Sequence, residues 1–455
     1  MERYIKGLLL GLVMASSSLL SCSKEFLEAK PQKSQVVVRT LDDIVALLDN
    51  AGVMNRTDFF KLLSDGDLFF TESQLMASQE TNRNLYLWKA DYDPTKFYSF
   101  GWDLPYQQIL YANIALETLD EIKPDATKQS LYNETRGRAL FFRAWAHYQL
   151  LQDFAEAYDP QRPEQLGVPI ILESTFPKQV KRAPLKEGYQ AIVADLETAE
   201  SLLSNISTIK TRPSRQAVYS LLSQVCLNMA DYPLSLSYSD KALEINKQLL
   251  DYNELSPTGI MPFDQYNDAS HPEIVFFASS NTSFVAKEGI ECVEDLYDDY
   301  MVNDLRKRAF FNTAKQFVGT YSGRADYQFT GLAVDELYLT KAECLVRMDR
   351  LEEARKLIQT LLEHRYVDNV VTVTIPQNKD DLLRWILLER RKELFGRGTR
   401  WTDLKRLNRE PAQQKDLQRT YQGQDFELPA NSNRYVFFIP DSEVEMSGLE
   451  QNNRD

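Results

Sequence analysis

The chain has 455 residues, which is enough for one large domain or for two to three ordinary ones. Its 66 acidic and 52 basic residues give a formal net charge of −14, and because this charge would on average repel a phosphate backbone, it argues against nucleic-acid binding. Glycine is scarce at 17 residues, which argues against a glycine-rich phosphate loop, whereas 23 Tyr and 23 Phe supply a large core and leave rings over for a ligand face.

Residues 1–21 are typical of a secretory signal, because a charged start precedes an apolar run at residues 7–20 that is too short to span a bilayer. The run ends in the sequence LLSC, whose last residue is Cys22, and this resembles the lipobox of bacterial lipoproteins. We therefore expect cleavage before Cys22, lipidation of its thiol, and a polar tether at residues 22–38. An ordinary signal with an unrelated cysteine is the alternative, and the position of Cys22 after the apolar run disfavours it.

The first predicted helix covers residues 41–48, because Thr40 can act as its N-cap and Asp43 places a negative charge in its first turn. Residues 64–100 are rich in aromatic side chains but show no sustained helical or strand period. A helical pattern returns at residue 102 and continues to about residue 121.

Residues 135–155 are predicted to form a buried helix. Apolar residues fall on one face at helical spacing, and Phe141, Phe142 and Trp145 widen that face until the middle of the helix is apolar nearly all round. Such a helix requires partner helices on several sides. His147 lies within it and is predicted to be a hydrogen-bonded core residue rather than a ligand.

Residues 159–184 contain five of the 18 prolines, so this segment cannot be a helix and is predicted to be irregular chain. Helices are expected again at residues 185–203, 214–229 and 234–249, and the last two form a tetratricopeptide-like pair.

Small residues occur where the two helices of such a pair must touch. In the first pair these positions carry Ser223, Ser235 and Ala242, and the pattern recurs 119 residues later with Ala342 and Ala354. Repeats of this kind bury a continuous core only by stacking on one another, so repeats interrupted by inserts are predicted. The helical scaffold is expected at about residues 104–158, 185–249 and 334–407, with ligand-side inserts at about residues 64–103 and 250–331.

Glu389 and Glu393 lie four residues apart on one predicted helix face, which invites an acid–base interpretation. Acid–base catalysis would need two carboxylates with separated pKa values in a cleft. Arg390, Arg391 and Arg400 are close in sequence and would keep both carboxylates ionised, so structural ion pairs are the prediction.

No metal template or catalytic motif is present. After Cys22 the chain has three cysteines, an odd number that cannot all pair internally, and Cys226 and Cys344 sit in helical patterns typical of buried thiols. The state of Cys292 stays open. We therefore predict no catalytic residue, no metal site and no cofactor.

Several of these segments together resemble the SusD/RagB family of Bacteroidetes outer-membrane nutrient-binding lipoproteins, in the family's order and over nearly the whole chain. The chain departs from the family pattern at Ala155, Ala333 and Arg397, where members often carry Gly, Arg and Glu. The matching motifs are Trp102-x-x-x-Tyr106-x-x-Ile109-x-x-Ala112-Asn113, Arg138-x-x-Phe141-x-Arg143-Ala144, Gly167-x-Pro169, Tyr300-x-x-x-Asp304-x-Arg306, Glu336-x-Tyr338-Leu339-x-x-Ala342-Glu343, Glu389-Arg390-Arg391-x-Glu393-Leu394, Gly398-x-Arg400-Trp401-x-Asp403-Leu404, Ile439-Pro440 and Gln451-Asn452.

The resemblance implies that residues 22–455 form a single α-dominated domain, with tetratricopeptide-like helix pairs in a right-handed superhelix, loop inserts and a few short strands. It implies a non-enzymatic lipoprotein at the outer membrane, facing the exterior, which binds an oligosaccharide and passes it to a SusC-like TonB-dependent transporter. A peptide ligand, as for RagB-like members, is the alternative. A surface glycoside hydrolase and a scaffold without ligand are the other hypotheses that stay open.

Ligand contacts in the family lie mainly in the aromatic segment before the W-x-x-x-Y motif and in the main insert. Aromatic rings stack on sugar faces, while amides and carboxylates bind hydroxyl groups. Plain packing is the alternative for every one of these side chains. The predicted ligand-binding residues are Trp88, Tyr92, Tyr98, Tyr321 and Tyr327, with Asp65 and Asn84 as polar contacts.

Overall fold

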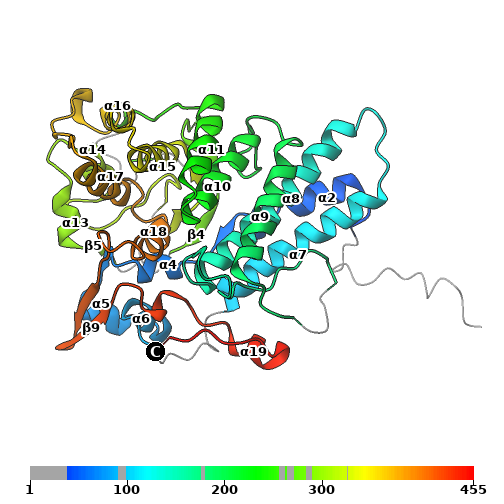
Figure 1. The fold of residues 1–455 in the computed structure, drawn as a ribbon, viewed down its shortest axis with the longest axis horizontal. Coiled ribbons are helices and arrows are strands. Elements are labelled where there is room, and N and C mark those ends of the chain that lie inside the picture. The colour runs from blue at the N-terminus through cyan, green and yellow to red at the C-terminus, as the bar shows by residue number, and fades with distance from the viewer. Residues whose placement is uncertain are drawn as a thin grey trace, which may run out of the picture. The chain divides into compact units, whose positions relative to one another are not determined.

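The computed structural model describes residues 38–90, 99–175, 180–255, 262–263, 271–282, 289–324 and 326–454. Thr40–Asp455 form one compact unit in which helices dominate (Figure 1), as the sequence predicts. Within the described residues no helix combines the length and the apolar character needed to cross a bilayer. Three of the residues singled out from the sequence, Cys22, Tyr92 and Tyr98, lie outside the described residues.

The N-terminal part begins with the predicted helix α2 (Leu41–Leu48). The side-chain oxygen of Thr40 accepts a hydrogen bond from the backbone N–H of Asp43 at 3.2 Å, and the Asp43 carboxylate accepts one from the Thr40 N–H at 3.0 Å. This capping box explains where the helix begins. The aromatic segment that follows forms only short elements: α3 (Ala51–Met54), β1 (Arg56–Thr57), α4 (Phe60–Ser64), β2 (Leu68–Phe69), α5 (Glu72–Ala77) and α6 (Glu80–Tyr86).

Three long helices follow, α7 (Ser99–Glu121), α8 (Gln129–Phe154) and α9 (Leu185–Glu200), and α8 packs against both of the others. This confirms the predicted buried helix and its need for partners on several sides. His147 on α8 is also a hydrogen-bonded core residue: its Nδ1 lies 3.0 Å from the Arg143 carbonyl oxygen, and its Nε2 accepts from the backbone N–H of Ile171 at 3.2 Å.

The tetratricopeptide-like pair is formed by α10 (Arg215–Asn228) and α11 (Tyr232–Ile245). Helix α11 begins two residues before the predicted start, because Asp231 accepts a hydrogen bond from the backbone N–H of Leu234 and caps the first turn. The Ser223 hydroxyl lies 2.7 Å from the Ser239 hydroxyl across the helix contact. The two helices therefore meet here through small side chains that carry hydroxyl groups, instead of the small apolar side chains that are common at such positions.

The second predicted repeat is formed by α15 (Val334–Arg347) and α16 (Leu351–Glu363), and Ala342 and Ala354 are fully buried there. Helix α15 packs against α11 and also against α17 (Lys379–Glu393), which is followed by α18 (Thr399–Leu407). The two repeats are thus neighbours in space (Figure 1) although a long insert separates them in sequence.

Small sheets join the insert to the scaffold. Strand β3 (Ile274–Phe276) pairs with β7 (Leu332–Ala333) directly before α15. The other elements of the second half are β4 (Ser279–Asn281), β5 (Glu291–Cys292), α13 (Glu294–Asp299), α14 (Leu305–Phe310), β6 (Tyr327–Phe329), β8 (Leu417–Tyr421), β9 (Gln424–Leu428) and α19 (Asp441–Ser447).

One sheet brings together segments from three distant parts of the chain, in the order β1-β4-β6. Thr57 pairs with Ser280, and Ser280 pairs with Gln328, so these three side chains share one face. Because side chains alternate between the faces of a strand, Arg56 and Tyr327 lie on the opposite face. This sheet therefore has two different polar faces.

Candidate functional site

Trp88, the first predicted ligand-binding ring, lies inside the N-terminal part. Its side chain is 1% exposed, its Nε1 donates to the Ser64 carbonyl oxygen at 2.8 Å, and the Arg419 guanidinium lies 4.4 Å from its ring centre. The Trp88 ring is therefore held by contacts within the protein, which favours the packing alternative for Trp88.

The two predicted polar contacts are buried as well. Asp65 is 2% exposed, and its carboxylate accepts a hydrogen bond from the backbone N–H of Asp67 at 3.0 Å. Burial, together with the negative charge of Asp67, raises the pKa of Asp65 well above its usual range. Asn84 lies buried on α6. Burial of both residues favours the packing alternative for them as well.

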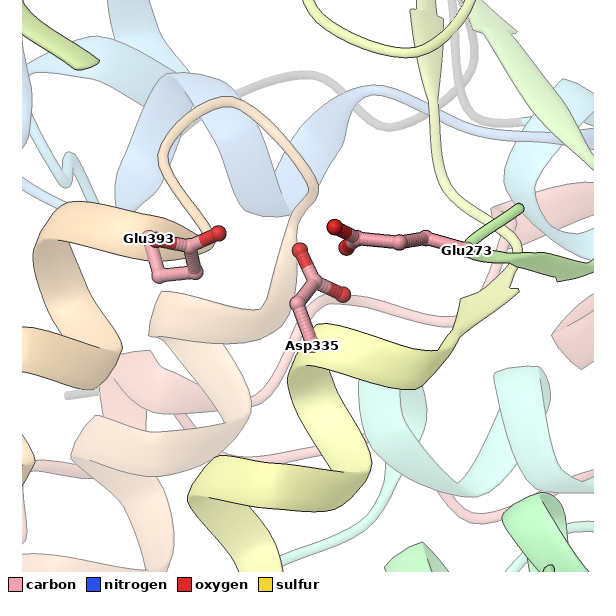
Figure 2. Close-up of side chains that lie close together, drawn as sticks. All are labelled: Glu273, Asp335 and Glu393. Carbon is pink, nitrogen blue, oxygen red and sulfur yellow. The ribbon is translucent and has the colours of Figure 1, made fainter. Parts of the chain in front are cut away.

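Tyr321 belongs to a buried charge network rather than to a surface. The carboxylates of Glu273, Asp335 and Glu393 come from the segment before β3, from α15 and from α17, and point toward one another (Figure 2). The Tyr321 hydroxyl lies 2.6 Å from the Glu273 carboxylate and 3.0 Å from the Asp335 carboxylate. The ring is fully buried, so here too the structure favours packing.

Guanidinium groups neutralise these three carboxylates. Arg365 bridges Glu273 at 2.8 Å and Glu393 at 2.7 Å, and Arg397 donates two hydrogen bonds to Asp335 at 2.9 and 2.6 Å. Burial raises the pKa of Glu273 to about 7, whereas at Asp335 burial is outweighed by the charge of Arg397 and the pKa is lowered. The arginines thus supply the positive charge that a cation would bring to such a cluster.

Glu389 and Glu393 form ion pairs, as predicted, but not with the arginines next to them in sequence. Arg306 from α14 donates to Glu389 at 2.7 Å and to Glu393 at 3.1 Å. Arg390 pairs instead with Glu336 of α15 at 2.8 Å. The two carboxylates are therefore structural, and α17 uses them to hold α14.

Among the predicted rings in the described structure, Tyr327 remains partly exposed. It lies in a cluster of four partly exposed residues that we call the arginine–tyrosine face: Arg56, Phe100, Arg324 and Tyr327. The Arg324 guanidinium carbon lies 4.7 Å from the Tyr327 ring centre, and that of Arg56 lies 5.5 Å from it. Arg56 also lies 5.7 Å from the Phe100 ring. Arg56 Nε has no hydrogen-bond partner among the described residues.

The arginine–tyrosine face combines an aromatic ring with guanidinium donors at a partly exposed position. The two guanidinium groups cover part of the Tyr327 ring, so a sugar can contact the exposed part of the ring while those groups donate to its hydroxyls. Arg56, Phe100 and Arg324 were not predicted from the sequence. Arg324 lies three residues before Tyr327 in the chain, whereas Arg56 and Phe100 come next to Tyr327 only through the β1-β4-β6 sheet and the start of α7, which no local pattern signals.

Comparison with known families finds two matches that lie in different parts of the chain. Residues 25–227 match a family described as starch-binding and associating with the outer membrane, and residues 305–453 match the SusD family. A curated relative, the SusD-like protein P38 of Formosa agariphila, is 39% identical over 79 residues. That match spans only 16% of the relative's length and 16% of this chain.

Solved structures with the same fold cover almost the whole chain. A SusD superfamily protein from Bacteroides thetaiotaomicron has a TM-score of 0.74 at 20% identity, covering 91% of this chain and 100% of its own. A putative sugar binding protein from Bacteroides vulgatus has a TM-score of 0.73 at 20% identity, covering 92% of this chain and 99% of its own. At this identity the likeness shows the fold.

Proposed function

The chain belongs to the SusD/RagB family, and we propose that it captures an oligosaccharide at the cell surface and delivers it to a SusC-like TonB-dependent transporter. The description of the matched family as starch-binding and associated with the outer membrane supports this proposal. The lipobox at Cys22 would attach the chain to the outer membrane, facing the exterior.

The observation that carries the proposal is the arginine–tyrosine face. Tyr327 is partly exposed, and Arg56 and Arg324 lie beside its ring. Arg324 is held in place by Asp326, whose carboxylate accepts two hydrogen bonds from it at 2.8 and 2.6 Å. A fixed guanidinium next to an aromatic ring loses little side-chain entropy when a saccharide binds.

We propose binding without turnover. The carboxylates singled out in the sequence, Glu389 and Glu393, are buried and paired with Arg306, so neither is available to protonate a glycosidic oxygen. Incubation of the purified protein with mixed glycans, followed by analysis of the products, tests this. Release of shortened oligosaccharides would refute it.

The proposed site is tested by a glycan array followed by calorimetry with the best ligand. Tyr327→Ala should weaken affinity by roughly 1–3 kcal/mol, if stacking on a sugar has the scale of aromatic–base stacking. Tyr132→Ala is a matched control, because Tyr132 is also partly exposed, but it lies on α8 and its hydroxyl donates to the Leu119 carbonyl oxygen of α7 rather than to the β1-β4-β6 sheet.

Equal affinities for wild type and Tyr327→Ala would remove the arginine–tyrosine face from the binding site. Binding of peptides on a parallel array, with no glycan bound, would replace the oligosaccharide by a peptide as the cargo.

A further inference from the structure

A polar cavity of about 60 Å³ lies on the other face of the β1-β4-β6 sheet from the arginine–tyrosine face. The sheet lines it with Thr57, Ser280 and Gln328, and α8 contributes Trp145. The opposite wall is formed by residues 396–399, which lead into α18. The cavity is therefore separate from the proposed oligosaccharide site.

Three of the residues that line this cavity carry a buried donor without a partner among the described residues. Trp145 Nε1, Ser280 Oγ and Arg397 Nε have no hydrogen-bond partner among the described residues, and their residues are 2%, 2% and 4% exposed. The two nitrogens can only donate, and the hydroxyl can donate as well. Because a buried donor without an acceptor is unfavourable, the cavity wall calls for an acceptor-rich group.

The start of α18 adds further donors to the same wall. Gly398 and Thr399 line the cavity, and no side chain caps this nine-residue helix. The first N–H groups of a helix have no partner within the helix, and the helix dipole favours a negative group next to them. The start of α18 therefore favours a negatively charged acceptor in the cavity.

Each acidic side chain in the lining is paired with a base, which lowers its repulsion of a negative ligand, and Lys61 is shared with Asp153 at 2.8 Å. Asp58 accepts from Lys61 at 3.3 Å, and Arg390 donates to both Glu336 and Asp403 at 2.8 Å. Arg397, whose two terminal nitrogens bind Asp335, keeps its Nε for another acceptor.

We propose that this cavity binds one oxyanion, a carboxylate or a sulfate, either free or as the acidic group of a saccharide. Its volume of about 60 Å³ exceeds the roughly 10–15 Å³ that one water molecule needs, so it has room for a small oxyanion. A charged acceptor in the cavity would offer a partner to the donors of Trp145, Ser280 and Arg397. This proposal does not depend on the one for Tyr327.

The test is calorimetric titration of the folded protein with sodium sulfate, sodium acetate and sodium glucuronate, with glucose as the neutral control. The oxyanions should bind, and their affinity should fall about tenfold or more in Trp145→Phe, which keeps the ring and removes one hydrogen bond to a charged group. Sulfate or acetate alone would mark a site for a free anion. Stronger binding of glucuronate would mark a site for an acidic saccharide.

Trp401→Phe is the matched control. Trp401 is fully buried and its Nε1 also lacks a partner among the described residues, but it does not line the cavity, so its replacement should leave oxyanion affinity unchanged. Tyr327→Ala should leave it unchanged too, which separates this site from the oligosaccharide site. If Trp145→Phe fails to fold, Ser280→Ala gives the same comparison.

No heat with any of the three anions would overturn the proposal, and ordered water would then be the occupant of the cavity. Equal affinity in wild type and both donor variants, Trp145→Phe and Ser280→Ala, would overturn it as well, because the anion would then bind elsewhere.

Discussion

Replacement of Trp88 by alanine separates packing from ligand binding most directly. The ring is 1% exposed, donates to the Ser64 carbonyl oxygen and lies under Arg419, so its removal should cost about 3–5 kcal/mol of unfolding free energy, as for other large core truncations. Affinity for an oligosaccharide should stay unchanged in the fraction that remains folded.

The backbone at Trp88 does not complicate this measurement. Its φ of 52° is in the left-handed region, which is unfavourable for any residue with a Cβ. Alanine and phenylalanine both keep the Cβ, so they keep that strain and report on the ring alone. Trp88→Phe removes the hydrogen bond to Ser64 but retains an aromatic ring, and it should cost about 1–3 kcal/mol.

Urea unfolding with a common slope gives the free energies, and calorimetry gives the affinities. Trp385→Ala is the control, because Trp385 on α17 is partly exposed and its loss should cost about 1 kcal/mol or less. An unfolding free energy within about 1 kcal/mol of wild type for Trp88→Ala, with affinity lowered by roughly 1–3 kcal/mol, would refute the packing interpretation and return Trp88 to the binding site.

Three further predictions concern the anchor, the scaffold and the core. Cys22→Ser should shift the protein from the detergent phase to the soluble or unprocessed fraction, and unchanged partition would contradict lipidation. Ala342→Leu should overpack α15 and cost about 1–3 kcal/mol in urea unfolding, whereas equal stability would show that the contact is loose. Burial, with the charge of Arg143, lowers the pKa of His147 from 6.5 to about 3. Between these pH values the folded chain binds fewer protons than the unfolded chain, so the free energy of unfolding falls as the pH falls from 6.5 to about 3. His147→Gln should remove up to about 1.4 kcal/mol per pH unit of that slope, and parallel pH profiles would refute a neutral buried imidazole.

The sequence by itself determined the features that rest on local patterns. Thr40 and Asp43 mark the start of α2 because a capping box needs only residues three apart. The apolar circumference of α8 requires burial whatever surrounds it, and the glutamates on α17 require positive partners once they are inside. The motifs of the family extend along the chain in order, so they indicated the fold as well.

Tertiary structure decided which side chains reach a ligand. Tyr321 and Tyr327 are six residues apart in similar polar surroundings, yet Tyr321 lies against Glu273 and Asp335, whereas Tyr327 lies on a sheet face beside Arg56. Trp88 is enclosed by Arg419, which follows it by more than 300 residues. Whether an aromatic ring is exposed depends on the residues that pack against it. Those residues lie far from the ring in the sequence, and only folding brings them close. The same holds for the polar cavity, whose donors Trp145, Ser280 and Arg397 come from three separate parts of the sequence.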